Sequence, residues 1–125
     1  MGDIMAKKVI RFEDLEVWKE GMRLARDIYK QLKPSKDFGL KGQMQRASVS
    51  IPSNIAEGFE RKTNNEFIHF LFVAKGSCAE LRTQLYLAKE IQEIDNRVAD
   101  DLLARAVVVS KMLYRLIETR REKFS

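Results

Sequence analysis

The sequence predicts an all-α protein, namely an antiparallel up-and-down four-helix bundle whose second helix is kinked at a proline. Hydrophobic residues make up 45% and charged residues 33% of the 125 residues, and only two prolines and six glycines interrupt the chain. Apolar residues recur at steps of three and four in four segments, whereas no segment shows the sustained alternation of a strand. Four amphipathic helices with short connections favour such a bundle.

The first helix is predicted over residues 15–32, with Asp14 as its N-cap and Pro34 just beyond its end. Its apolar residues at steps of four and three share one face: Trp18, Met22, Ala25, Tyr29 and Leu32. The second helix begins near residues 38–40. Its predicted core face has the same spacing: Leu40, Met44, Ala47, Ile51 and Ile55.

The third helix is predicted from a capping box at Thr63 and Glu66 to about Glu90. Its inward face is long: Phe67, Phe70, Ala74, Ser77, Cys78, Leu81, Leu85 and Ala88. Asp95 or Asn96 caps a fourth helix that ends near Arg120, and the inward residues of that helix recur with helical spacing: Val98, Leu102, Ala106, Val109, Leu113, Leu116 and Ile117. We therefore expect a flexible arm at 1–11, the bundle at 12–121 and a tail at 122–125.

The sequence SVSIPSNIAEGFERK at residues 48–62 is unusual for a helix. Pro52 lacks an N–H group and crowds the carbonyl of Ser48, so a helix that passes through it must bend. Asn54 falls on the inward side and needs hydrogen-bond partners, because an unpaired buried amide costs about 1–3 kcal/mol. Ser77 and Glu80 on the third helix are the expected partners.

Gly58 and Gly76 are expected to let the second and third helices approach closely. Three interpretations of this motif remain open. It is a structural device, a kinked helix held by a polar network; or Asn54 and Glu57 form a ligand or catalytic site; or the segment is an interaction surface.

The counts of cysteine and histidine, and the catalytic motifs that the sequence lacks, restrict the other classes of function. One cysteine, Cys78, excludes a disulfide within the chain, and one histidine, His69, excludes a zinc site built from Cys and His. No phosphate-binding glycine loop, metalloprotease motif or nucleophile elbow is present, so no enzyme activity and no cofactor or metal are expected. No apolar run approaches the ~20 residues that cross a membrane, and no secretory signal is recognisable, which predicts a cytoplasmic protein.

The runs QMQRASVSIPSNIAEGFER and EFIHFLFVAKGSCAEL, together with FEDLEVWKEGMRLARDIY, carry a family resemblance. Over roughly residues 12–120 the chain resembles the four-helix-bundle family named for proteins encoded in intervening sequences of bacterial 23S rRNA genes. A related branch, the accessory variability proteins of diversity-generating retroelements, forms pentamers that bind nucleic acid and a reverse transcriptase. The resemblance implies a four-helix bundle and suggests a pentameric ring.

A second apolar stripe on the third helix predicts self-association, because contiguous exposed apolar surface usually marks an interface. Its residues are spaced by four, seven and seven: Ile68, Phe72, Ala79 and Tyr86. Val17 and Leu24 extend the apolar surface of the first helix. The alternative is that the third helix is central and is buried on two sides by its own bundle.

The chain has 23 basic and 18 acidic side chains and a net charge of +5, which permits nucleic-acid binding without requiring it. The candidate contacts lie in the N-terminal arm, on the fourth helix and at its end: Lys7, Lys8, Arg11, Arg97, Arg105, Lys111, Arg115, Arg120, Arg121 and Lys123. They form either a solvated face or a phosphate-binding surface. The leading hypothesis is a non-enzymatic homo-oligomer that binds RNA, and the alternative is a scaffold that binds another protein.

Overall fold

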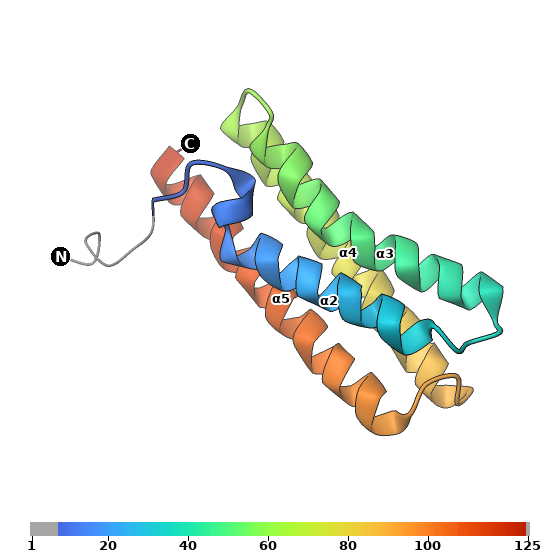
Figure 1. Cartoon of the computed structure of the whole chain (residues 1–125). Helices are drawn as coiled ribbons and strands as arrows, with labels where there is room; N and C mark the ends of the chain where they lie inside the picture. The colour runs from blue at the N-terminus through green and yellow to red at the C-terminus, as the bar shows by residue number, and fades with distance from the viewer. Residues whose placement is uncertain (1–7, 125) are drawn as a thin grey trace.

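The computed structural model describes residues 8–124, which form four long helices and one short 3-10 turn. The turn η1 spans Phe12–Asp14, and the helices are α2 (Glu16–Leu32), α3 (Phe38–Phe59), α4 (Asn64–Glu90) and α5 (Asn96–Phe124). The helices lie side by side, and the loops between successive helices fall at alternate ends of the bundle (Figure 1). Residues 8–124 contain no strand. The predicted all-α four-helix fold is confirmed.

Polar side chains cap three of the helices at their first turns. Asp37 accepts a hydrogen bond from the Leu40 amide at the start of α3 (3.1 Å), and Thr63 accepts one from the Glu66 amide at the start of α4 (3.2 Å). Asp95 does the same for α5, where its carboxylate accepts from the Arg97 amide at 3.0 Å. These caps supply acceptors to N–H groups that have no partner within the helix.

The predicted N-cap at Asp14 is wrong. Its carboxylate accepts from the amides of Ile10 (3.1 Å) and Arg11 (3.2 Å), and these hydrogen bonds lower the pKa of Asp14. Asp14 therefore closes η1, while Leu15 precedes α2 without a side-chain cap.

The buried face of α2 is rotated from the predicted one. Gly21, Leu24 and Ile28 lie on the core side, whereas Met22 and Tyr29 remain 45% and 46% exposed. The reason is that α2 packs against both α3 and α5, so the arc between these two neighbours is buried and the Met22 side lies at its edge. The predicted interface positions Val17 and Leu24 are thus core residues, at 4% and 0% exposure.

Pro52 lies inside α3, which is one helix from Phe38 to Phe59, and the predicted bend stays a prediction. The proline ring is buried against α2, where a Cβ atom added to Gly21 would lie 3.5 Å from the Pro52 Cδ atom. The glycine thus leaves room for the proline, and this contact brings α2 and α3 together in the middle of the bundle.

The polar network of the motif runs through Ser50. The Asn54 amide donates to the Ser50 carbonyl and the Ser50 hydroxyl, both at 2.8 Å, and the hydroxyls of Ser50 and Ser77 are 2.8 Å apart. Asn54 is half-buried and reaches α4 through this serine instead of directly. Glu80, the other predicted partner, is exposed and makes no hydrogen bond to Asn54.

The two motif glycines differ. A Cβ atom added to Gly58 would lie 2.6 Å from the Phe70 Cβ atom, so the predicted close approach of α3 and α4 is present at this position. Gly76 is exposed, and no atom would lie within 4 Å of its added Cβ, so the predicted close approach there is wrong.

Contacts between distant segments define the two ends of the bundle. At one end the Ser35 hydroxyl and the Glu93 carboxylate are 3.0 Å apart, which joins the α2–α3 loop to the α4–α5 loop. At the other end Asn64 contacts Arg120, which joins the start of α4 to the end of α5. Helix α5 includes residues 122–124, which were expected to form a tail. In the described part of the chain no helix is long and apolar enough to cross a membrane.

Candidate nucleic-acid interface

Within residues 8–124, the cations predicted to contact nucleic acid lie in several separate places. Lys7 lies outside the described residues, and Lys8 and Arg11 are exposed before η1. The Arg11 Nε atom lies 3.7 Å from the Asp14 carboxylate and 4.0 Å from that of Glu13. The positive charge of Arg11 is therefore partly offset by its own neighbours.

Arg105 belongs to an ion-pair cluster between α2 and α5. Its guanidinium lies 2.8 Å from the Asp27 carboxylate and 3.8 Å from that of Asp101. The hydrogen bond from Arg26 is the largest cause of the lowered pKa of Asp27, and the hydrogen bond from Arg105 lowers it further. Arg97 lines the same surface beside both aspartates. The acidic residues of this side offset its positive charge.

Arg120, a predicted nucleic-acid contact at the end of the fourth helix, is a structural link between α4 and α5. Its Nε donates to the Asn64 Oδ1 atom at 2.8 Å, its carbonyl accepts from the Asn64 amide at 3.1 Å, and its guanidinium lies 5.1 Å from the centre of the Phe67 ring. Burial lowers the pKa of Arg120. Arg121 lies 3.3 Å from Glu118 and 5.3 Å from the Phe72 ring centre, while Lys123 is exposed.

Two of the predicted cations, Lys111 and Arg115, border a cleft between α4 and α5. The cleft has a volume of about 240 Å³ and is lined by one residue of α4 and four of α5: Lys75, Ser110, Lys111, Tyr114 and Arg115. None of the lining residues is acidic. Within residues 8–124 no carboxylate lies within 4.0 Å of the charged groups of Lys75, Lys111 or Arg115.

This cleft has the chemistry of an anion site. Three cations and the Ser110 hydroxyl can donate hydrogen bonds to phosphate oxygens, and Tyr114, 53% exposed, offers a ring on which a base could stack. The sequence reasoning missed Lys75, because it lies on another helix from the other cations. Its place on the predicted third helix, three residues after Phe72 of the apolar stripe, was the available signal.

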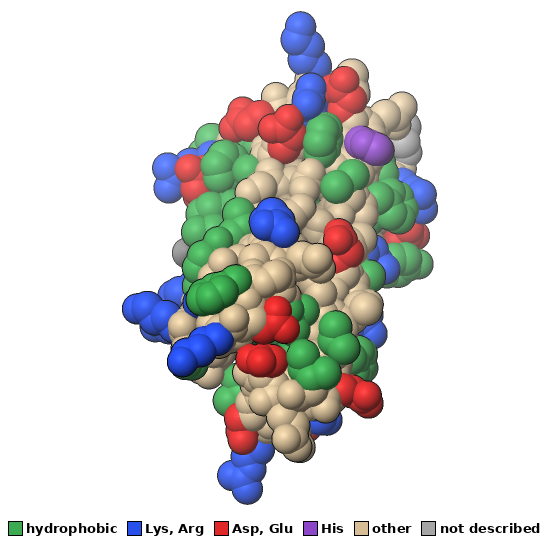
Figure 2. Space-filling view, turned by 90° about the vertical axis from the view of Figure 1, so that its right-hand side faces the viewer, with side chains coloured by type: hydrophobic (Ala, Val, Ile, Leu, Met, Phe, Trp, Pro, Cys, Tyr) green, Lys and Arg blue, Asp and Glu red, His purple; other side chains and the backbone are tan. Residues whose placement is uncertain are grey.

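The face shown in Figure 2 carries hydrophobic side chains interspersed with charged side chains of both signs. On α4, Phe72 and Tyr86 are 43% and 55% exposed and Ala79 is exposed, whereas Ile68 is half-buried and packs against the core. Most of the predicted α4 stripe therefore faces solvent in the single chain.

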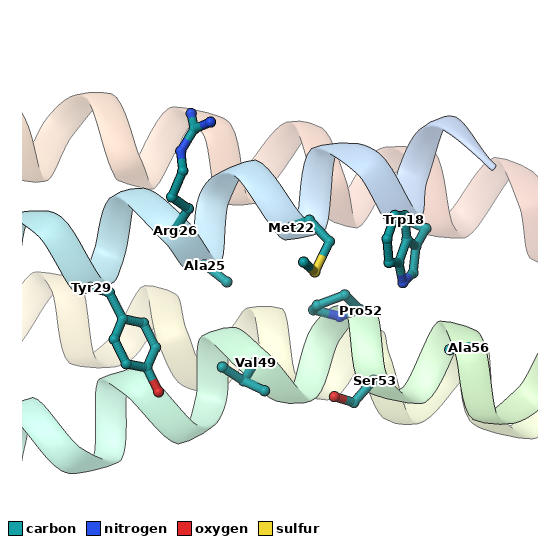
Figure 3. A pocket seen from close by; sticks show the side chains of 9 residues that line it. All are labelled: Trp18, Met22, Ala25, Arg26, Tyr29, Val49, Pro52, Ser53 and Ala56. Carbon is teal, nitrogen blue, oxygen red and sulfur yellow. The ribbon is translucent and has the colours of Figure 1, made fainter. Parts of the chain in front are cut away.

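An apolar groove of about 460 Å³ lies between α2 and α3. Its lining comes from both helices: Trp18, Met22, Ala25, Arg26, Tyr29, Val49, Pro52, Ser53 and Ala56. Figure 3 shows Met22 opposite Pro52, and the Arg26 side chain pointing away from α3. The sequence reasoning did not find this groove, because it assigned Met22 and Tyr29 to the core.

Groups that could support catalysis are dispersed. His69 is exposed on α4, and Cys78 is buried, which raises the pKa of its thiol to about 12. A thiol with such a pKa is not a nucleophile at neutral pH. No group of three or more potential metal ligands occurs in residues 8–124.

Residues 13–115 match the model of a family described as 23S rRNA-intervening sequence protein. The chain belongs to this family. The match covers most of the bundle, from η1 to Arg115 in α5, and it includes Lys75, Lys111 and Arg115. The family resemblance drawn from the motifs is thereby confirmed. No curated protein matches the sequence.

A crystal structure of a Bacteroides thetaiotaomicron protein of unknown function, from the S23 ribosomal protein family, has a similar fold. The two chains superpose with a TM-score of 0.78 at 23% sequence identity, over 81% of this chain and 97% of the other. At this identity the similarity supports the fold of the bundle and nothing further.

Proposed function

We propose that this protein binds structured RNA through phosphate contacts, as a homo-oligomer and without catalytic activity. The observation that carries the proposal is the α4–α5 cleft, where Lys75, Lys111 and Arg115 converge and no acidic residue contributes to the lining. The family description refers to 23S rRNA, which makes ribosomal RNA the first ligand to test. Phosphate contacts position a protein on nucleic acid and carry no base information, so weak sequence preference is expected.

Assembly would strengthen such binding. Each chain contributes a net charge of +5, and several copies sum their electrostatic fields at the surface of the oligomer. The exposed part of the α4 stripe supports self-association, because a single chain leaves Phe72 and Tyr86 about half in solvent. A closed ring would present the cleft once per chain.

The test is a filter-binding titration of 23S rRNA fragments at several salt concentrations. Affinity should fall with salt, with a log–log slope of about −0.7 to −0.9 per phosphate contact. The double variant Lys111→Ala, Arg115→Ala should weaken binding to all RNA sequences alike and flatten that slope, because two contacts are removed. Arg120 is unsuited to this test, since its replacement would also loosen the contact between α4 and α5.

The matched control is Lys36→Ala, Lys62→Ala, which removes the same charge from two exposed positions outside the cleft. This control should retain nearly the wild-type slope. Equal losses in both double variants would mean that net charge acts without a site. Failure to retain RNA at low salt would contradict the proposal.

The second candidate is a scaffold that binds another protein, and the α2–α3 groove favours it. Groove residues such as Met22, Tyr29 and Val49 are 41–46% exposed, and apolar clefts of this kind are typical of docking surfaces. Under this alternative the cations serve solubility, and RNA retention would be absent at every salt concentration.

A further inference from the structure

We infer that the α2–α3 groove is the receptor for the α4 stripe of a second copy of this chain, so that subunits pair head-to-tail with their bundles parallel. The inference rests on the proposed self-association and names the two surfaces that make the contact. It assigns a partner to the groove and to the stripe at once. Burial of both surfaces would remove the exposed apolar side chains from water.

The two surfaces lie on opposite sides of the bundle. Helix α2 packs against α3 and α5, and α4 packs against α3 and α5, while no Cα atoms of the diagonal pairs α2–α4 and α3–α5 lie within 8 Å of each other. The groove is therefore on the α2–α3 side. The stripe faces the α4–α5 side, because Phe72 lies under Arg121 of α5 and Lys75 lines the cleft with α5.

The groove suits an aromatic stripe. Its floor is formed by Pro52 and Ala25, both buried, and its walls by Trp18, Met22 and Tyr29. Phe12 supports the wall at one end, because its ring packs edge-on against Trp18 with the ring centres 5.4 Å apart. Aromatic side chains that enter apolar pockets dominate the binding energy of many interfaces.

The charges at the ends of the two surfaces are complementary. Beyond Tyr29, the groove ends at Lys33 and Lys41, whereas the stripe continues beyond Tyr86 to Glu90. These charged ends of the groove and of the stripe both lie at the end of the bundle where the loops that carry Ser35 and Glu93 meet. In parallel bundles, Glu90 of one copy therefore meets Lys33 and Lys41 of the next.

The charge pairing lies at this one end of the contact. At the other end, α3 ends at Phe59 and is followed by Glu60, whereas Lys75 lies inside the stripe, between Phe72 and Ala79, and lines the cleft with Lys111 and Arg115. Within residues 8–124 none of the three charged groups of this pairing lies within 4.0 Å of an opposite charge of its own chain: Lys33, Lys41 and Glu90.

The contact between two different surfaces determines which kind of oligomer can form. A groove that binds a different surface of the next copy makes a heterologous contact, which forms a ring where the rotation between copies closes and an open filament where it does not. A stripe that paired with a second stripe would instead stop at a dimer. Lys111 and Arg115 lie on α5 beside the stripe, so each chain in the ring retains its cationic residues near the junction.

A mixing experiment with two variants tests the pairing by light scattering coupled to size exclusion. Met22→Glu blocks the groove and Phe72→Glu blocks the stripe, and each purified variant should have the mass of one chain, 14.5 kDa. The first variant keeps an intact stripe and the second an intact groove. Their equimolar mixture should therefore form a species of twice the chain mass, and nothing larger.

Val108→Glu is the matched control, because Val108 is an apolar α5 residue, 52% exposed, outside both surfaces. It should keep the wild-type mass. The charge reversal Glu90→Lys should reduce the mass, and Lys33→Glu with Lys41→Glu in the same chain should restore it. Because all of these side chains are exposed or half-exposed, circular dichroism should show a folded bundle in every variant.

The pairing is contradicted if Met22→Glu retains the wild-type mass, or if the mixture stays at the mass of one chain. A monomeric wild type at micromolar concentration would overturn it together with the proposed self-association. RNA retention is measured separately, so loss of the pairing with retained RNA binding would leave the phosphate site standing.

Discussion

The two glycines of the paired motifs have opposite surroundings, and this difference decides what each one does. Gly58 faces Phe70 and Phe67 across the α3–α4 contact, where a Cβ atom would lie 2.6 Å from the Phe70 Cβ and 3.2 Å from the Phe67 carbonyl oxygen. Gly76 has open space around it. The first glycine is required by packing, whereas the second only lowers the helix propensity of α4.

Gly58→Ala should therefore lower the free energy of unfolding by about 1–3 kcal/mol, because the methyl group forces backbone or Cβ atoms apart. Gly76→Ala should raise it by about 0.5–1 kcal/mol, since alanine is the better helix former. Urea unfolding of both variants checks the pair. Equal effects of the same sign would contradict the difference in packing.

Asn54 shows how a motif acts through local hydrogen bonds. Its amide nitrogen donates to the carbonyl and the hydroxyl of Ser50 within α3, and Ser50 carries the link to Ser77 on α4. The structural interpretation of the motif accounts for these contacts. Glu57 points to a separate role, because it lies 2.7 Å from Arg61 in an exposed ion pair at the end of α3.

At the scale of elements, charged side chains connect neighbouring helices at the surface of the bundle. Arg105 of α5 lies 2.8 Å from Asp27 of α2, and Lys89 of α4 lies 2.7 Å from Asp100 of α5. Asp27 also lies 3.1 Å from Arg26 in its own helix. Exposed pairs of this kind contribute modestly to stability, because water and salt screen them.

The Asp27 contact should make stability depend on pH. Because its pKa is lowered in the folded state from 3.8, its stabilisation is present above the unfolded value and is lost as the pH falls through the lower folded value. Asp27→Asn should therefore cost about 0.2–1 kcal/mol at neutral pH and nothing once the wild-type carboxyl is protonated.

Unfolding by urea at neutral pH and at several values below 4 measures this dependence. Asp101→Asn is the control, because its carboxylate lies farther from the same guanidinium, at 3.8 Å, and is 67% exposed. A penalty for Asp27→Asn that persisted unchanged in acid would refute an electrostatic origin.

The whole molecule is held by one core to which all four helices contribute. Leu24 from α2, Ile51 from α3, Leu81 from α4 and Leu113 from α5 are all fully buried. The groove and the stripe are two apolar surfaces that remain outside this core, on opposite sides of the bundle. The core therefore determines the fold of one chain, and the outer surfaces are left for association.

Leu81→Ala should open a cavity in this core and lower the free energy of unfolding by about 2–5 kcal/mol. Leu87→Ala, on the same helix but 50% exposed, should change it by no more than about 0.5 kcal/mol. Thermal or urea denaturation of the two variants compares them. Similar effects of the two substitutions would contradict the difference in burial between Leu81 and Leu87.

The sequence by itself determined the four helices, most of their capped ends and the core faces of α3, α4 and α5. Periodicity and capping are local, so Thr63, Asp95 and the spacing of residues such as Ile51 and Leu85 were sufficient. The tertiary structure decided which arc of α2 is buried, because periodicity orders residues around one helix but does not say where its neighbours lie. For the same reason, only the packed bundle shows that Lys75 lies beside Lys111 and Arg115. It also shows that Arg120 is hydrogen-bonded to Asn64 and that a groove lies next to Met22.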